Sequence, residues 1–499
     1  MQLTFAHKLL TASIAGLLLP LAYAPFDLFW VAPLSYAALF YVWSGLTPFQ
    51  ALWTGFAFGC TSFFAGVHWV YVSIHDFGPA HPFLAGTITF ALVLFLACYV
   101  AFTGWLAARW FPTEGSRAWL AVFPALSVLT EWCRGWLLSG FGWLAAGYSQ
   151  TDSWLMGYAP MGGVYLMSWA VLITAGALLC LALGNRKRRI VAGVGLVALW
   201  GTGFFLGQHR WGEPTGNVLT VALVQGAVPQ DLKWQPEQLG PTLELYQRLT
   251  GESEGSRLII WPEAAIPVLY DRVPGYLDSI REWAAERGST VALGILRADP
   301  GGGTFQNTVV VLGERPSFYV KRHLVPYGEV FPVPGFVRRW LRLISLPYTD
   351  AVAGAPGQAP LKMAGETVGV TICYEDVFGA EQIHYLPEAT LLVNVSNDAW
   401  FGDTIAPHQH LQIARVRSAE ASRYTLRAAN TGISAIIDPR GRIVGRSPQF
   451  EPHVLKGAVQ GYTGRTPYVV WGNYLAVAAA LIVALSQLAT TKFTIRPRT

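Results

Sequence analysis

The stretch Val368-Gly-Val-Thr-Ile-Cys-Tyr-Glu-Asp376 sets the pattern for the polar part of this chain, since an apolar run ends in a reactive side chain. Cys373 is the only cysteine between about residues 217 and 465, so it has no disulfide partner within that region. A free thiol that faces an oxidising compartment is a liability unless it has a use. The stretch therefore predicts a strand that ends in a functional cysteine.

Two further apolar runs end in the groups that a nucleophilic thiol needs. Leu258-Ile-Ile-Trp-Pro-Glu263 ends in a carboxylate, and Ser317-Phe-Tyr-Val-Lys321 ends in an amine. A carboxylate can take the proton of the thiol, and an ammonium can stabilise an oxyanion and lower the pKa of the thiol. Taken singly, such residues are more often turn residues or small buried hydrophobes. Together they predict covalent catalysis, with all three side chains at strand ends along one edge of a sheet.

The rest of the polar stretch alternates between short β-rich runs and helical patterns. Turn signals such as Asp299-Pro-Gly-Gly-Gly303 separate the runs, which is typical of an α/β or α+β layered domain. The predicted strands are 218–224, 258–261, 290–295, 307–312, 318–320, 368–373, 391–395 and 433–437, and the predicted helices are 238–250, 276–287 and 408–424.

The N-terminal part has the composition of a membrane bundle. The chain of 499 residues is 53% hydrophobic and only 13% charged, and before residue 210 the charges are sparse. The apolar runs between them are long enough to cross a hydrocarbon core, which needs roughly 20 helical residues. Eight spans are predicted, at about 9–24, 26–43, 52–74, 83–110, 118–138, 158–184, 190–210 and 468–489. Lys8 and the apolar run up to Ala24 also fit a cleaved signal peptide, but Pro25 and the next span favour a retained first span.

Basic residues orient this arrangement. Arg186-Lys-Arg-Arg189 lies between two long apolar runs and is expected on the cytoplasmic side, as are Lys492, Arg496 and Arg498 in the tail. The predicted organisation is a membrane bundle at 1–212, an extracytoplasmic catalytic domain at 217–465, and a last span with a cytoplasmic tail at 466–499.

Charge and motif patterns exclude several other classes of function. The net charge of +5 comes from the segments that flank the apolar runs, so nucleic-acid binding is not expected. The histidine spacing suits no metal site, no glycine-rich phosphate loop occurs, and no cofactor is expected. Glu131 and Arg134, one helical turn apart in an apolar run, are predicted to form a structural pair rather than a transport path.

A short basic amphipathic helix is predicted after the Lys321 run. Its apolar face is expected to lie in the lipid headgroup layer beside the active site, and the alternative is an ordinary helix packed on the domain. The apolar positions are Phe336, Trp340, Leu343 and Ile344, and Arg338, Arg339 and Arg342 lie on the other face.

Four motifs in order carry a family resemblance. They are Trp261-Pro-Glu263, Lys321-Arg-His-Leu-Val-Pro-Tyr-Gly-Glu329, Cys373-Tyr-Glu-Asp376 and Asn394-Val-Ser-Asn-Asp-Ala-Trp-Phe-Gly402. They resemble the nitrilase (carbon–nitrogen hydrolase) superfamily, and with the membrane bundle the whole chain resembles its membrane branch, the apolipoprotein N-acyltransferases. The fold that this implies is an αββα sandwich attached to about eight membrane helices.

The resemblance implies a role for each motif residue. Glu263 would be the general base, Lys321 the oxyanion-stabilising amine and Cys373 the nucleophile. Tyr374 would offer its backbone N–H to the oxyanion. The supporting residues would be Glu329, Glu375 and Trp234.

The resemblance also implies a reaction with two half-steps. Cys373 would take an acyl chain from a phospholipid as a thioester, and the α-amine of a diacylglyceryl-modified N-terminal cysteine of an apolipoprotein would then accept it. A monomer in the bacterial cytoplasmic membrane, with the catalytic domain on the periplasmic face, is expected. Two alternatives stay open at this point: a membrane-tethered amidase or nitrilase that releases its product to water, and a transporter or scaffold with an inactive domain.

Overall fold

The structure is a computed structural model that describes residues 4–78, 80–326, 328–330 and 351–495, with side chains as far as residue 490. The chain forms two compact units. The first contains residues 1–210, 403–420 and 466–499, and the second contains residues 211–402 and 421–465.

All regular secondary structure described in the first unit is helical. Several helices start with a proline in the first turn and a side-chain cap. In α3 (Pro48–Val67), for example, Thr47 forms a capping box with Gln50. The main helices are α1 Phe5–Leu18, α2 Val31–Trp43, α3 Pro48–Val67, α4 Trp69–His75, α5 Pro82–Trp110, α7 Phe123–Arg134, α8 Ala159–Leu183, α9 Arg186–Gln208, α15 Ala406–Ala421, α16 Pro467–Trp471 and α17 Tyr474–Ile495, with a short α6 at Gly115–Arg117.

Some of these helices are long and apolar enough to cross a membrane. Four helical segments qualify, and a fifth qualifies if α3 and α4, which are bent by 56°, count as one broken span. The four are Phe5–Ala22, Pro82–Trp110, Trp154–Leu183 and Arg186–Gln208, while Val31–Trp43 and Tyr474–Thr490 are apolar but shorter. Each of the eight predicted spans contains a helix, but the count of eight crossings stays a prediction.

Close backbone contact holds α3 against α5. A Cβ atom on Gly59 would lie only 2.7 Å from the Cα of Ala97, so only glycine permits this approach. Small residues at helix contacts are typical of membrane bundles, where the hydrophobic effect does not drive helices together.

Glu131 and Arg134 bind the backbone that follows α7. Arg134 donates from Nη1 to the carbonyls of Phe141 at 2.6 Å and Trp143 at 2.5 Å, and Glu131 accepts from the backbone N–H of Ala146 at 2.8 Å. Each of the two charges therefore binds the loop that follows α7, and their purely structural role stays a prediction.

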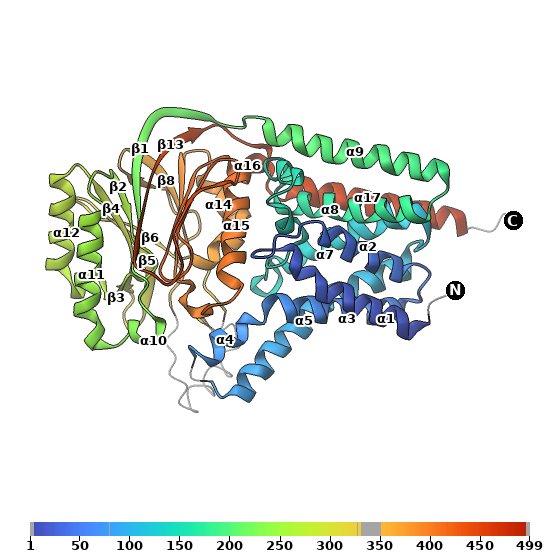
Figure 1. The fold of residues 1–499 in the computed structure, drawn as a ribbon, viewed down its shortest axis with the longest axis horizontal. Coiled ribbons are helices and arrows are strands. Elements are labelled where there is room, and N and C mark those ends of the chain that lie inside the picture. Colours follow the sequence, from blue (N-terminus) through green and yellow to red (C-terminus); the bar gives the residue numbers. More distant parts are fainter. Residues whose placement is uncertain (1–3, 79, 327, 331–350, 496–499) are drawn as a thin grey trace. The chain divides into compact units, whose positions relative to one another are not determined.

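Two β-sheets form the second unit (Figure 1). The order of the first sheet is β13-β1-β2-β4-β5-β6, with β3 paired to β4, and the order of the second is β12-β11-β10-β9-β8-β7. The strands of the first are β1 Glu213–Gln225, β2 Leu258–Ile260, β3 Ile266–Leu269, β4 Thr290–Ala298, β5 Phe305–Leu312, β6 Ser317–Val320 and β13 His453–Thr463; those of the second are β7 Leu361–Met363, β8 Glu366–Ile372, β9 Leu391–Ser396, β10 Thr425–Ala429, β11 Ala435–Ile437 and β12 Ile443–Arg446.

Each sheet has three neighbouring parallel strands at its centre. In the first sheet β1, β2 and β4 are parallel, and in the second β8, β9 and β10 are parallel. Parallel strands end at the same edge, so the residues that follow them come together there. This arrangement brings the predicted strand-end side chains close to one another.

The two sheets share one apolar core, and helices cover the outer face of the first sheet. Side chains such as Val221 and Val309 of the first sheet pack with Val370 and Val393 of the second. On the outer face, α11 Leu239–Glu252 and α12 Pro274–Glu286 lie side by side and bury a separate apolar cluster (Figure 1). These are three successive layers of the sandwich that the resemblance implied.

All eight predicted strands are present, but others were missed. The sequence did not reveal β3, β7, β10, β12 and β13. Strand β10 contains Arg427, which is 0% exposed, and a charged residue at the centre of a strand hides the apolar pattern by which buried strands are recognised. The amphipathic segment with Phe336, Trp340, Leu343 and Ile344 lies outside the described residues.

Candidate active site

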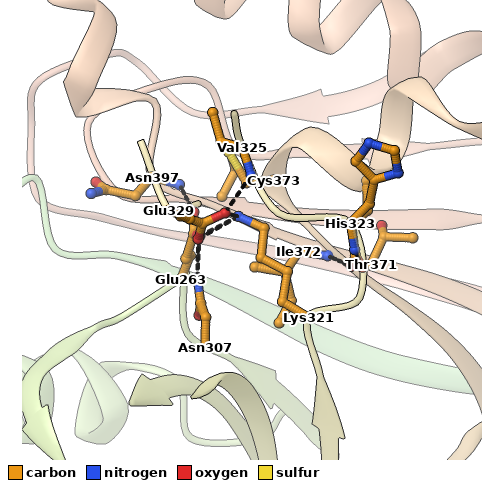
Figure 2. A network of polar contacts seen from close by, with 12 residues as sticks. Glu263, Asn307, Lys321, His323, Val325, Glu329, Thr371, Ile372, Cys373 and Asn397 are labelled. Atoms are coloured by element: carbon orange, nitrogen blue, oxygen red, sulfur yellow. Dashed lines mark hydrogen bonds and ion pairs between the residues drawn. The ribbon is translucent and has the colours of Figure 1, made fainter. Parts of the chain in front are cut away.

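The three predicted catalytic side chains come from two sheets that face each other. Glu263 follows β2, Lys321 follows β6, and Cys373 follows β8 of the other sheet. The prediction of a single sheet edge is therefore wrong, because the sequence shows where strands end but not which sheet each strand joins. Figure 2 shows Glu263 and Lys321 in contact, with Cys373 beside them.

Cys373 follows β8 directly and is the first residue of the 3₁₀ helix Cys373–Val377, where the backbone makes a strained turn. Its φ is +52°, in the left-handed region that non-glycine residues rarely adopt. Such strain persists where the surroundings enforce it, and it is often part of a functional site. The side chain is 8% exposed. The turn therefore holds the sulfur in one place.

The carboxylate of Glu263 accepts three hydrogen bonds. They come from Lys321 Nζ at 3.2 Å, from Asn307 Nδ2 at 2.7 Å and from the backbone N–H of Asn397 at 2.8 Å. Gly294 on β4 permits this geometry, since a Cβ atom there would lie 2.6 Å from the Cα of Glu263. Both carboxylate oxygens are thus oriented by the protein.

Lys321 is buried between two carboxylates. The side chain is 1% exposed, and its Nζ lies 2.9 Å from Glu329 as well as 3.2 Å from Glu263. Asn307 bridges the same two acids, because its Nδ2 also donates to Glu329 Oε1 at 3.1 Å. The backbone N–H of Val325 donates to the other oxygen of Glu329 at 2.9 Å. The ammonium therefore has little freedom to move.

These contacts determine the resting charge of each group. Burial alone would raise the pKa of Glu263, but Lys321 and the hydrogen bonds bring that pKa below its ordinary value. Burial alone would lower the pKa of Lys321, but Glu263 and Glu329 raise that pKa instead. Burial raises the pKa of the Cys373 thiol, Glu263 raises it further, and Lys321 opposes them. At neutral pH the site therefore holds a carboxylate, an ammonium and a protonated thiol.

Glu375 joins the turn of Cys373 to the segment that carries Lys321. Its carboxylate accepts from the backbone N–H groups of Ile372 at 2.7 Å, Arg322 at 2.7 Å and His323 at 3.1 Å. Burial raises the pKa of Glu375 to about 7, and these donors oppose the rise. The Glu375 side chain thus fixes the turn of Cys373 relative to the segment that carries Lys321.

Comparisons with known proteins decide the family. A family model described as the apolipoprotein N-acyltransferase N-terminal domain matches residues 15–177, and one described as carbon–nitrogen hydrolase matches residues 220–468. An apolipoprotein N-acyltransferase of Methylococcus capsulatus is 43% identical over 94% of this chain and 93% of its own length. The chain belongs to the apolipoprotein N-acyltransferase family.

A second relative agrees with this assignment. The apolipoprotein N-acyltransferase of Nitrosomonas europaea is 43% identical over 96% of both chains. Among solved structures, an amidase of the nitrilase superfamily from Nesterenkonia is 19% identical, with a TM-score of 0.36 over 50% of this chain and 92% of its own.

The remaining motif residues of this apolipoprotein N-acyltransferase family member lie near the site to different degrees. Glu329 and Glu375 are in the contact network, while the ring of Tyr374 packs edge-on against Phe378. Trp234 follows the short helix α10 Gln230–Lys233 and is 45% exposed. Its neighbour Lys233 is buried and donates to the backbone carbonyl of Glu263 at 3.2 Å.

Several site residues of this family member escaped the sequence reasoning. The sequence predicts Asn307 only as part of a strand, and no pattern distinguishes Lys233, which lies beside Trp234. Asn397 belongs to the fourth motif, but the resemblance implies no role for it. In the sequence, each of these three residues is a polar residue next to a motif or a strand end. Only the contact with Glu263 in the structure distinguishes them from ordinary surface residues.

Proposed function

We propose that this protein N-acylates the α-amine of the S-diacylglyceryl N-terminal cysteine of apolipoproteins, with an acyl chain from a phospholipid. One observation carries the mechanism: a buried carboxylate and a buried ammonium, 3.2 Å apart, stand beside a cysteine that is held on a strained turn. The family supports the substrate class, since both relatives described above bear the name apolipoprotein N-acyltransferase over nearly the full chain.

In the first half-reaction Cys373 becomes acylated. Glu263 takes the proton from Sγ as the sulfur attacks the ester carbonyl of the phospholipid. The ammonium of Lys321 and the backbone N–H of Tyr374 stabilise the oxyanion. The tetrahedral intermediate then collapses, Glu263 returns its proton to the departing alkoxide, and a lysophospholipid leaves.

In the second half-reaction the thioester is consumed. The neutral α-amine of the lipoprotein cysteine attacks the thioester carbonyl, and Glu263 accepts a proton from the nitrogen. The thiolate leaves, regains a proton from Glu263, and an amide remains. A thioester suits this step because it combines an activated carbonyl with a good leaving group.

Two features of the site support acyl transfer between these substrates. The raised pKa of Cys373 keeps the thiol protonated at rest, so the nucleophile is formed only when Glu263 removes its proton. Glu263 and Lys321 are 6% and 1% exposed, and a site from which water is excluded protects a thioester from hydrolysis.

The proposal includes a location in the bacterial cytoplasmic membrane. Eight crossings would place the second unit on the periplasmic face and the C-terminus in the cytoplasm. The basic run at 186–189 and the apolar helices α5, α8 and α9 support this topology.

Detection of an acyl-enzyme tests the function. Purified full-length protein is incubated with a phospholipid labelled in its acyl chain, and the peptide that contains Cys373 is examined by mass spectrometry. We expect an acyl adduct on Cys373, and we expect Glu263→Ala to abolish it.

A second substrate then distinguishes transfer from hydrolysis. With an S-diacylglyceryl peptide we expect loss of the adduct and formation of an N-acyl peptide. If no adduct forms in the wild type, the mechanism is wrong. If the adduct is released only as free fatty acid, the protein is a hydrolase.

A further inference from the structure

A polar network lies behind Cys373 on the second sheet. Strands β8 and β9 are parallel with Ile372 opposite Val395, so the next residues, Cys373 and Ser396, are neighbours at the carboxyl edge. The Ser396 hydroxyl lies within reach of the Cys373 side chain and acts to lower the pKa of its thiol. A carboxylate oxygen of Asp398 lies within 4.8 Å of Sγ. The mechanism described above uses neither Ser396 nor Asp398.

The hydroxyl of Ser396 has two acceptors but one hydrogen. It donates to Asp398 Oδ1 at 2.8 Å. While that bond is made, the same hydrogen cannot be donated to the sulfur. A neutral thiol has little need of the donor, whereas a buried thiolate needs it strongly, since an unpaired buried charge is costly.

Asp398 is held in place independently of Ser396. Its Oδ2 accepts from Arg427 Nη2 at 2.8 Å, and both side chains are 0% exposed. Arg427 also donates to Asn394 at 2.5 Å. Loss of the hydrogen bond from Ser396 would therefore leave Asp398 still paired and oriented.

We propose that Ser396 is a further catalytic residue that works as a hydroxyl switch, and that Asp398 is the positioning residue that holds the switch in its resting state. While Cys373 is a thiol, Ser396 donates to Asp398. When the proton of Sγ moves to Glu263, the hydroxyl turns and donates to the thiolate. Only that one proton is transferred, and the Ser396 hydrogen stays on its oxygen.

The switch would keep the thiol protonated until a substrate is bound. The thiolate is the form of cysteine that oxidants attack, so a resting thiol is protected in an oxidising compartment. The charged groups that act on Cys373 within this unit are Glu263 and Asp398, which favour the thiol, and Lys321, which favours the thiolate. The inference rests on the proposed role of Cys373 as nucleophile.

Alkylation of Cys373 tests the switch without any lipid substrate. Full-length protein in detergent is treated with iodoacetamide between pH 7 and 10, and mass spectrometry follows the Cys373 peptide. Ser396→Ala should slow alkylation about fourfold to tenfold at neutral pH, because each unit by which the thiol pKa rises removes nine-tenths of the thiolate, partly offset by its higher nucleophilicity. Ser396→Thr should restore the wild-type rate within about twofold, since it keeps the hydroxyl.

Asp398→Asn should have the opposite effect. Removal of the competing anion frees the hydroxyl for the sulfur and removes a nearby negative charge, so alkylation should be about fourfold to tenfold faster. The gain should shrink in the Ser396→Ala background, because Asp398 acts partly through the hydroxyl. The matched control is Ser434→Ala, which removes an equally buried hydroxyl that binds Gln225 at 2.8 Å, and it should leave the rate unchanged.

Some results would overturn the switch. An unchanged alkylation rate in folded Ser396→Ala would overturn the switch. Slower alkylation in Asp398→Asn would also overturn it, because that result is expected if the two residues served folding alone. If Ser396→Ala does not fold, Asp398→Asn decides, and a rate no higher than wild type rejects the inference. Alkylation requires neither phospholipid nor lipoprotein. Failure of the proposed acyl transfer would therefore appear in the acyl-enzyme assay and can be distinguished from failure of the switch.

Discussion

Three side chains, Glu263, Lys321 and Glu329, share one site, and the pKa values of Glu263 and Lys321 depend on their neighbours. Two carboxylates that face one ammonium leave a net negative charge in a region where isolated charges are costly. Asn307 reduces this cost, because one amide nitrogen donates to both acids. At the residue scale, the charge of Glu263, the proposed base, is determined by its neighbours in space rather than by its neighbours in the sequence.

This dependence predicts a shift of the pH–rate profile in Asn307→Ala. The hydrogen bond from Asn307 lowers the pKa of Glu263, so its loss raises that pKa. The base works as a carboxylate, and activity falls as pH drops through its pKa. The acid limb should therefore move up by about one pH unit, the equivalent of one hydrogen bond to a charged group. The measurement is the rate of Cys373 acylation by labelled phospholipid as a function of pH.

A neighbour on the same strand provides the control for this shift. Gln306→Ala removes an amide that instead binds Asp299 at 3.2 Å, and its acid limb should stay in place. An acid limb that does not move in Asn307→Ala would show that Glu263 gains nothing from this contact.

At the scale of elements, the parallel strands of each sheet decide which residues meet. Cys373 and Ser396 are 23 positions apart in the chain, yet they are neighbours because β8 and β9 run in the same direction with matched register. Strand β10 adds Arg427 beneath them, opposite Asn394 of β9. The central strands thus carry both Cys373, the proposed nucleophile, and charged groups close to it.

Burial of Arg427 predicts a large loss of stability in Arg427→Met. The change leaves the carboxylates of Asp398, 2.8 Å away, and Asp376, 3.6 Å away, without their cation in a dry environment. Breaking a buried ion pair by removal of one partner typically costs about 3–5 kcal/mol. Thermal unfolding of the full-length protein in detergent should show a lower midpoint, and Asp398→Asn in the same chain should recover part of the loss.

The exposed Arg446 on β12 offers a matched comparison. Arg446→Met removes the same charge at the sheet edge, where a substitution typically changes stability by less than about 0.5 kcal/mol. If Arg427→Met were equally mild, the buried network would contribute little to folding.

At the scale of the whole molecule, the chain passes back and forth between its two units. Helix α15 follows the motif that ends at Gly402, yet residues 403–420 group with the helical unit rather than with the sheets. Within that unit Arg415 binds Asp152 at 2.6 Å. The catalytic unit is therefore built from two separate stretches of chain, with a segment of the helical unit between them.

The proposed topology predicts a pattern of cysteine labelling in intact cells. Glu244→Cys on α11 should react with a membrane-impermeant maleimide when only the periplasm is accessible. Lys187→Cys, in the first turn of α9, should react only after the cells are lysed, because the basic run is expected in the cytoplasm. Both positions are exposed.

The unmodified chain measures the background from the native cysteines in the same experiment. Labelling of Glu244→Cys only after lysis would reverse the proposed orientation, and labelling of both positions before lysis would contradict the crossing between them.

The sequence by itself determined the parts of this protein that depend on local pattern. Apolar runs located the helices of the bundle, alternation located most strands, and four motifs made Glu263, Lys321 and Cys373 the candidate catalytic residues. Period and composition are properties of a segment, so they can be read without knowledge of its partners. Strand β10 shows the limit of prediction from local pattern. Its buried Arg427 is tolerated only because of contacts with other segments.

The tertiary structure alone decided which groups meet. It placed the three motif residues on two facing sheets, surrounded Glu263 with Asn307 and Asn397, and put Ser396 beside the nucleophile. It also assigned the segment 403–420 to the helical unit. Each of these depends on strand pairing and burial between residues that are distant in sequence, and a contact of that kind leaves no periodic signal in either partner.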